Sequence, residues 1–176
     1  PVLSGVPYVF GDIEGNGKIR LELFNNYGDS KKDKTLADAF SKLAANKEIE
    51  VKFKLSGVPK GEYEAKLMFC DNDWKWNTMD SANPNPNKTV KVTGDGEYSV
   101  KLTAAEGAAV TNGAQVFCVD IDGLATALKI QNPKDATSAL KQKLAMDAGL
   151  KVSDVKILVD GVEFDPTGSN NGGDKK

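Results

Sequence analysis

Apolar and polar residues alternate with period two in several short segments of this chain. The alternation is clearest at residues 18–24 and 49–55, and it recurs at 88–92, 97–102 and 155–159. Successive side chains of a strand point to opposite faces, so each segment predicts a strand with one buried face. One-sided strands at this spacing indicate an all-β fold. We predict an antiparallel, jelly-roll-like β-sandwich with one or two short peripheral helices.

Two turns are expected to join neighbouring strands into hairpins. Residues 93–96 read Thr-Gly-Asp-Gly, and their glycines permit positive φ, so we expect 88–92 and 97–102 to pair. Asp160-Gly161 is a type I′ turn signal, and it predicts that 155–159 pairs with Val162-Glu163-Phe164.

Two segments, 63–70 and 114–121, are apolar on both faces at one end. We therefore predict that both are central strands whose second face is covered by a helix, a loop or a ligand, with a helix at 135–148 as the candidate. Cys70 and Cys118 share that second face. They are either two buried thiols or, if the register matches closely, a disulfide.

Helical patterns occur at two places. Residues 35–43 place apolar side chains on one helical face, namely Leu36, Ala39, Phe40 and Leu43. Residues 135–148 have a similar pattern, made by Ala136, Ala139, Leu140, Leu144 and Ala148. Asp135 suits the N-cap of this second helix, and Gly149 suits the residue after its end.

The chain has 176 residues, which is enough for one domain with a hydrophobic core. We expect residues 1–165 to form that domain and residues 166–176, rich in Gly, Asn and Lys, to form a linker or tail. Pro1 begins the chain without a signal-like segment, so we expect either a mature fragment or a module taken from a larger protein.

The composition argues against several classes of function. The net charge of −2 comes from 23 basic and 25 acidic residues without long runs of one sign, so we expect no nucleic-acid partner. The apolar runs are too short to cross a bilayer. Histidine is absent, which excludes Ser-His and Cys-His catalysis and the commonest metal ligand.

Both tryptophans, Trp74 and Trp76, lie where an apolar strand ends and a polar loop begins. On an extended segment, residues i and i+2 project to the same side, so both indoles can line one site. A sugar ring packs on an indole while neighbouring polar groups bond to its hydroxyls. The alternative is that one or both indoles cap the open edge of the sandwich. The polar candidates for hydroxyl contacts are Asn72, Asp73, Asn77, Gln115 and, more weakly, Tyr27.

Asp12 and Glu14 have the oxygen ligands that calcium prefers, but their spacing matches no EF-hand loop, and a solvated turn is favoured. We therefore predict no cofactor and no metal site. Asp120, Asp122 and Asp160 follow apolar strands, which is ordinary turn chemistry.

Four segments of the chain resemble non-catalytic carbohydrate-binding modules, the β-sandwich modules attached to plant-cell-wall glycoside hydrolases of anaerobic gut and rumen bacteria. The segments are residues 61–74, 18–28, 92–100 and 113–121, and together they spread over roughly residues 8–164. Related modules often display more tryptophans than the two found here.

The resemblance implies a secreted or surface-attached protein that binds β-linked glucans or hemicelluloses through surface aromatic residues, here Trp74 and Trp76, without catalysis. It also implies a covalently linked glycoside hydrolase or scaffold as partner. We expect a monomer. Two other functions stay open from the sequence: a protein-binding scaffold domain that uses the same loop, and a glycosidase that works with carboxylates alone.

Overall fold

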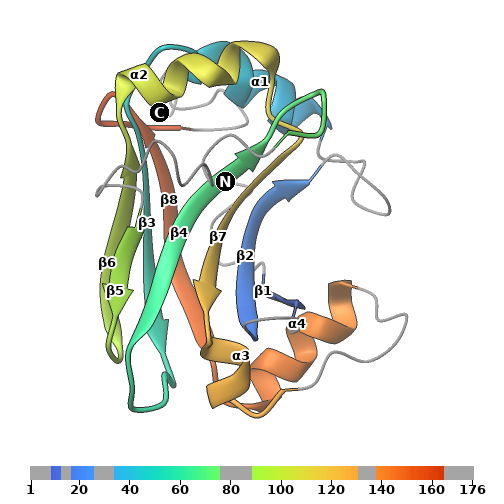
Figure 1. Ribbon diagram of the computed structural model, residues 1–176, viewed down its shortest axis with the longest axis vertical. Coiled ribbons are helices and arrows are strands. Elements are labelled where there is room, and N and C mark those ends of the chain that lie inside the picture. Colours follow the sequence, from blue (N-terminus) through green and yellow to red (C-terminus); the bar gives the residue numbers. More distant parts are fainter. Residues whose placement is uncertain (1–8, 13–16, 26–33, 76–88, 131–137, 165–176) are drawn as a thin grey trace, which may run out of the picture.

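The strands of the computed structural model form two antiparallel sheets that face each other (Figure 1). The structure describes residues 9–12, 17–25, 34–75, 89–130 and 138–164. The five-stranded sheet has the order β1 (Val9–Asp12), β2 (Lys18–Asn25), β7 (Val116–Asp122), β4 (Tyr63–Cys70) and β5 (Thr89–Val92). The four-stranded sheet has the order β6 (Gly96–Leu102), β3 (Ile49–Ser56), β8 (Lys151–Val159) and β9 (Val162–Glu163). The prediction of a mostly β, antiparallel fold is confirmed.

Short helices lie at both ends of the sheets. At one end are α1 (Lys34–Ala44) and α2 (Ala104–Gly107), with the 3₁₀ helix η3 (Ala108–Asn112) following α2; at the other are α3 (Leu124–Ala127) and α4 (Ser138–Asp147) (Figure 1). The described residues thus hold more helices than the one or two expected. The excess consists of single turns, α2, η3 and α3, which are too short to leave a helical period in the sequence.

One hydrophobic core joins the two sheets. It contains Leu67 and Val119 from the five-stranded sheet and Val51 and Ile157 from the four-stranded sheet. Phe40 of α1 closes one end of this core, because its ring stacks on Phe117 with the ring centroids 4.7 Å apart. The same ring lies 5.5 Å from Phe24 and 5.6 Å from Phe164. These contacts fix α1 over the ends of the strands.

One of the two predicted hairpins is correct and the other is wrong. Asp160 and Gly161 both have positive φ, 49° and 82°, and β8 pairs with β9 across them. The turn at residues 93–96 does not form a hairpin. Strand β5 pairs with β4 in one sheet, while β6 pairs with β3 in the other. The turn therefore carries the chain from one sheet to the other, a choice that local turn chemistry does not determine.

The prediction that 63–70 and 114–121 are central strands is confirmed, because β7 lies between β2 and β4. Their second face holds a separate buried cluster of Met68, Cys70, Val116 and Cys118. The two cysteines are free thiols. Cys70 lies opposite Val116 and Met68 lies opposite Cys118, so the register places the cysteines diagonally rather than opposite each other.

The predicted cover for this second face is wrong. Helix α4 packs against β1 and lies beside α3, at the end of the sheets opposite to Cys70 (Figure 1). The apolar faces of the helices also differ from expectation. In α1, Ala37 and Ala44 are buried with Phe40, whereas Leu43 is 42% exposed. In α4, Ala145 is buried and Leu140 is 41% exposed, while Asp135 lies outside the described residues.

Asp120 is not a turn residue as predicted, because it lies inside β7 and is 1% exposed. It accepts two hydrogen bonds from Arg20, at 2.8 and 3.1 Å, and its carboxylate lies 3.2 Å from Nζ of Lys18. Burial lowers the pKa of Arg20, but the bond to Asp120 and the nearby negative charges outweigh it and raise that pKa. Asp122 ends the same strand and pairs with Lys66 at 2.8 Å.

We expect Asp120→Ala to lower the free energy of unfolding by about 3 kcal/mol, because it leaves two cations without their buried counter-charge. Asp122→Ala is the matched control on the same strand. Its partner Lys66 is a third exposed, so the expected loss is below about 1 kcal/mol. Urea unfolding of both variants measures the difference, and equal losses would contradict this account.

Burial raises the pKa of the Cys118 thiol well above 9.0 and also raises that of Cys70. The folded state therefore keeps protons that the unfolded chain loses above about pH 9. Stability is unaffected by the thiols below that pH and falls above it, by at most about 1.4 kcal/mol per pH unit for each thiol and only until its folded-state pKa is reached.

We expect the double variant Cys70→Ala/Cys118→Ala to lose less stability than wild type between pH 8 and pH 10.5. Lysine and tyrosine titrations are common to both proteins, so the difference between two urea series isolates the thiols. Parallel pH dependence in the two proteins would refute the assignment.

Candidate functional site

The loop that follows β4 is a tight turn organised by Asp71, whose side chain is buried. Its Oδ1 accepts the backbone N–H groups of Asp73, at 2.8 Å, and Lys75, at 3.0 Å. Its backbone N–H donates to the carbonyl of Lys75 at 2.9 Å, and its carbonyl accepts from Trp74 at 3.0 Å. An Asp that bonds the backbone two residues ahead is an Asx-turn, and here the bonding extends over four residues.

Trp74 stands at the outer point of this turn. Its φ is 64°, in the left-handed region, and it is 49% exposed. A bulky residue there costs on the order of 1–2 kcal/mol, which the bonds made by Asp71 oppose. The prediction that Trp74 and Trp76 share a side rested on an extended segment. That premise is wrong, because the backbone turns at Trp74.

A second segment, at the junction between η3 and β7, holds the loop from the side. Nδ2 of Asn112 donates to Oδ2 of Asp73 at 3.1 Å, and the carbonyl of Asn112 accepts from the N–H of Asn72 at 3.3 Å. The Asn72 amide lies directly over Gly113, where a Cβ atom would stand 2.3 Å from Nδ2. Gly113 has a φ of 86°, a conformation that favours glycine, whereas the Asn72 side chain could move aside for a Cβ atom.

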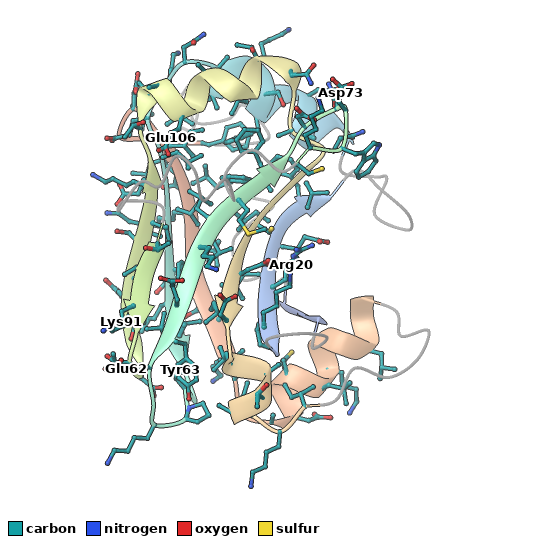
Figure 2. The ribbon with its side chains drawn as sticks, in the orientation of Figure 1. Arg20, Glu62, Tyr63, Asp73, Lys91 and Glu106 are labelled. Carbon is teal, nitrogen blue, oxygen red and sulfur yellow. The ribbon has the colours of Figure 1, made fainter. Side chains whose placement is uncertain are left out.

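A cavity of about 470 Å³ opens between this segment and α1. Its lining includes Asp38, Ser41 and Lys42 from α1, Thr111 from η3, and the side of the loop at Asn72, with Gln115 next to β7. Ser41 ties its two walls together, because its Oγ accepts the N–H of Ala114 at 2.8 Å and donates to the carbonyl of Ala37 at 2.8 Å. Figure 2 shows Asp73 at this end of the molecule, far from Tyr63.

The structure brings some of the predicted site residues together. Asn72 and Gln115, 43 positions apart in the sequence, line the same cavity, and Trp74 follows Asn72 by two residues. Asp73 is exposed and already bonded to Asn112. Trp76, Asn77 and Tyr27 lie outside the described residues.

The prediction that the chain has no metal site stays a prediction. Asp12 ends β1, and Glu14 lies outside the described residues. Within the part of the chain that the structure describes, no group of three or more metal-ligating side chains is present.

The residues that fix the shape of the site were not identified from the sequence. Asp71 carried a signal, because an Asp directly after a strand and before Asn-Asp suits an Asx-turn. Asn112 and the cavity residues of α1 carried none. Tertiary contacts place α1 beside residues 110–115, namely the packing of Phe40 and the hydrogen bond between Ser41 and Ala114.

No family model, no curated protein and no solved structure matches this chain. Among the described helices, none has the length and apolar character needed to cross a membrane. The functional inference therefore rests on the loop at residues 71–75 and on the cavity beside it.

We expect Asp71→Ala to lower the free energy of unfolding by about 1–3 kcal/mol, because two backbone N–H groups lose their acceptor. Amide hydrogen exchange at Asp73 and Lys75 should accelerate in this variant. Asp71→Asn keeps a carbonyl oxygen and should restore most of the protection. Slow exchange at both amides in Asp71→Ala would show that another group holds the turn.

Proposed function

We propose that this chain is a non-catalytic carbohydrate-binding module with a jelly-roll-like β-sandwich fold. Its ligand class is the β-linked glucans and hemicelluloses of plant cell walls, such as cellulose, mixed-linkage glucan and xyloglucan. The observation that carries the proposal is Trp74, a half-exposed indole held in a strained backbone conformation by a buried carboxylate. Strain of this kind is retained where a side chain is needed in a fixed position.

A pyranose ring suits this surface. Its axial C–H groups form an apolar face that packs on an indole, and about half of the Trp74 surface is open to such a contact. The turn fixes the backbone on both sides of Trp74, so little conformational entropy is lost when a sugar packs there.

The cavity beside the loop supplies the polar half of sugar recognition. The amides of Asn72 and Gln115 each offer donors and an acceptor, and Thr111 adds a hydroxyl. A sugar hydroxyl both donates and accepts, so this set matches it better than it matches an apolar protein partner. One glycan chain that stacks on Trp74 would place its next units over this cavity.

In this proposal the protein acts by docking alone. A secreted or surface-attached enzyme linked to the module is held at its polysaccharide, and its effective concentration there rises without new catalytic contacts. Trp76, Asn77 and Tyr27 remain proposed contributors to the same surface.

Affinity gel electrophoresis in hydroxyethylcellulose, mixed-linkage β-glucan and xyloglucan tests the proposal. We expect at least one polysaccharide to retard the wild-type protein and Trp74→Gly to abolish that retardation. Glycine accepts positive φ without strain, so the unfolding free energy should stay within about 1 kcal/mol of wild type. Lys75→Ala, in the same turn, is the control and should bind normally.

Asn72→Ala and Gln115→Ala should each weaken binding about three- to tenfold, the effect of losing one neutral hydrogen bond. Isothermal titration with soluble oligosaccharides of the retarding polysaccharide measures this. Unchanged retardation in both Trp74→Gly and Trp76→Ala would refute the proposal. Release of reducing sugar by the pure protein would indicate a glycosidase instead.

A further inference from the structure

A groove of about 410 Å³ lies on the outer surface of the four-stranded sheet, away from the loop at residues 71–75. Its charged and polar lining consists of Lys52, Lys54, Glu97, Ser99, Asp154 and Lys156. All six side chains point away from the core, on strands β3, β6 and β8, and five of the six are charged. Asp154, with a φ of 53°, lies at a bulge where the register between β3 and β8 shifts.

The register places two lysines of this groove directly opposite each other. Lys52 lies directly opposite Lys156 on β8, and its other cross-strand neighbour is Ser99 on β6. Like charges directly opposite each other destabilise a sheet. Within the described part of the chain, neither lysine has a carboxylate oxygen within 4.0 Å of its Nζ.

The other sheet shows how such a pair is normally neutralised. Glu64 of β4 lies opposite Asp122 of β7, so two carboxylates face each other there. Lys66 forms an ion pair with both, because its Nζ lies 3.7 Å from a carboxylate oxygen of Glu64 and 2.8 Å from one of Asp122. Figure 2 shows the outer face of this sheet, with Arg20 on it. Among the described residues, the lysine pair of the four-stranded sheet has no equivalent counter-ion.

We propose that this groove binds an acidic glycan through its uronic acid units. A sugar carboxylate supplies the counter-charge between Lys52 and Lys156, and charge-assisted bonds of this kind are the strong ones. The hydroxyls of the same sugar donate to Glu97 and Asp154 at the rim and exchange hydrogen bonds with Ser99. The site lies on a different sheet from Trp74 and does not depend on the function proposed for it.

The rim and the position of the groove select this ligand class. A sulfate group or a fully ionised phosphate ester has no hydroxyl donors to offer, so Glu97 and Asp154 would repel it, whereas a hydroxylated sugar acid satisfies both signs of charge. A peptide that binds by adding a strand needs a free sheet edge. The groove instead lies over β3, whose backbone already pairs with β6 and β8.

The test uses affinity gels and titration calorimetry with polygalacturonate and with its methyl-esterified form, which has the same backbone without the charges. We expect the wild-type protein to bind the acid form and not the ester. A protein of net charge −2 has no overall attraction for a polyanion, so binding must come from a local site.

The variant Lys52→Gln/Lys156→Gln should bind polygalacturonate about tenfold or more weakly, the loss expected for charge-assisted bonds. Its melting temperature should equal or exceed that of wild type, because the cross-strand repulsion is gone. Lys60→Gln/Lys129→Gln removes the same charge from exposed positions outside the groove and should bind like wild type. Trp74→Gly should also retain this binding, even if it loses retention on neutral glucans.

Three results would overturn the proposal. One is equal affinity for the acid and ester forms, which would mean that the protein does not recognise the carboxylates of the glycan. Another is an equal loss in the control variant Lys60→Gln/Lys129→Gln, which would mean that binding is non-specific. The last is tighter binding to polyglutamate than to polygalacturonate that depends on Lys52 and Lys156, which would assign the groove to an acidic peptide partner.

Discussion

The packing of Phe40 against Phe117 is the contact on which the geometry of this protein depends. Phe40 is fully buried on α1 and touches rings from β2, β7 and the end of the described chain. An aromatic side chain contributes more buried area than any other residue of such a short helix. Because this anchor sets the position of α1, it also sets one wall of the cavity at Asn72 and Gln115.

Strand positions follow directly from the alternation of side chains, since a strand with one buried face must alternate. Residues 49–55 and 97–102 match β3 and β6 within one residue. Strand pairing was harder to predict from the sequence, because residues 93–96 have the amino acids of a hairpin turn and yet connect strands of different sheets. Register and sheet membership depend on distant partners, and neither β-propensity nor turn chemistry encodes those partners.

The candidate site was likewise only partly predictable from the sequence. Exposure of Trp74 was predictable, because an indole among Asp and Asn has no local apolar environment to bury it. The turn at Trp74 was not, because its cause is the four-residue reach of one buried carboxylate. Asn72 and Gln115 meet only through the pairing of β4 with β7, which brings their ends together. The lysine pair on β3 and β8 depends likewise on a bulge that shifts the register.

The order of strands along the chain has a consequence for how the protein is made. The chain enters the five-stranded sheet, leaves it for the four-stranded sheet, and alternates in this way until β9. Interior strands of both sheets, β7 and β8, come late in the sequence. During synthesis the five-stranded sheet cannot be completed before Asp122 has left the ribosome, and the four-stranded sheet cannot be completed before Glu163 has done so. Earlier strands therefore wait with apolar faces exposed. Contacts between such distant segments slow folding, because long loops must close first. The hydrophobic core between the two layers can therefore close only after β8 has been made.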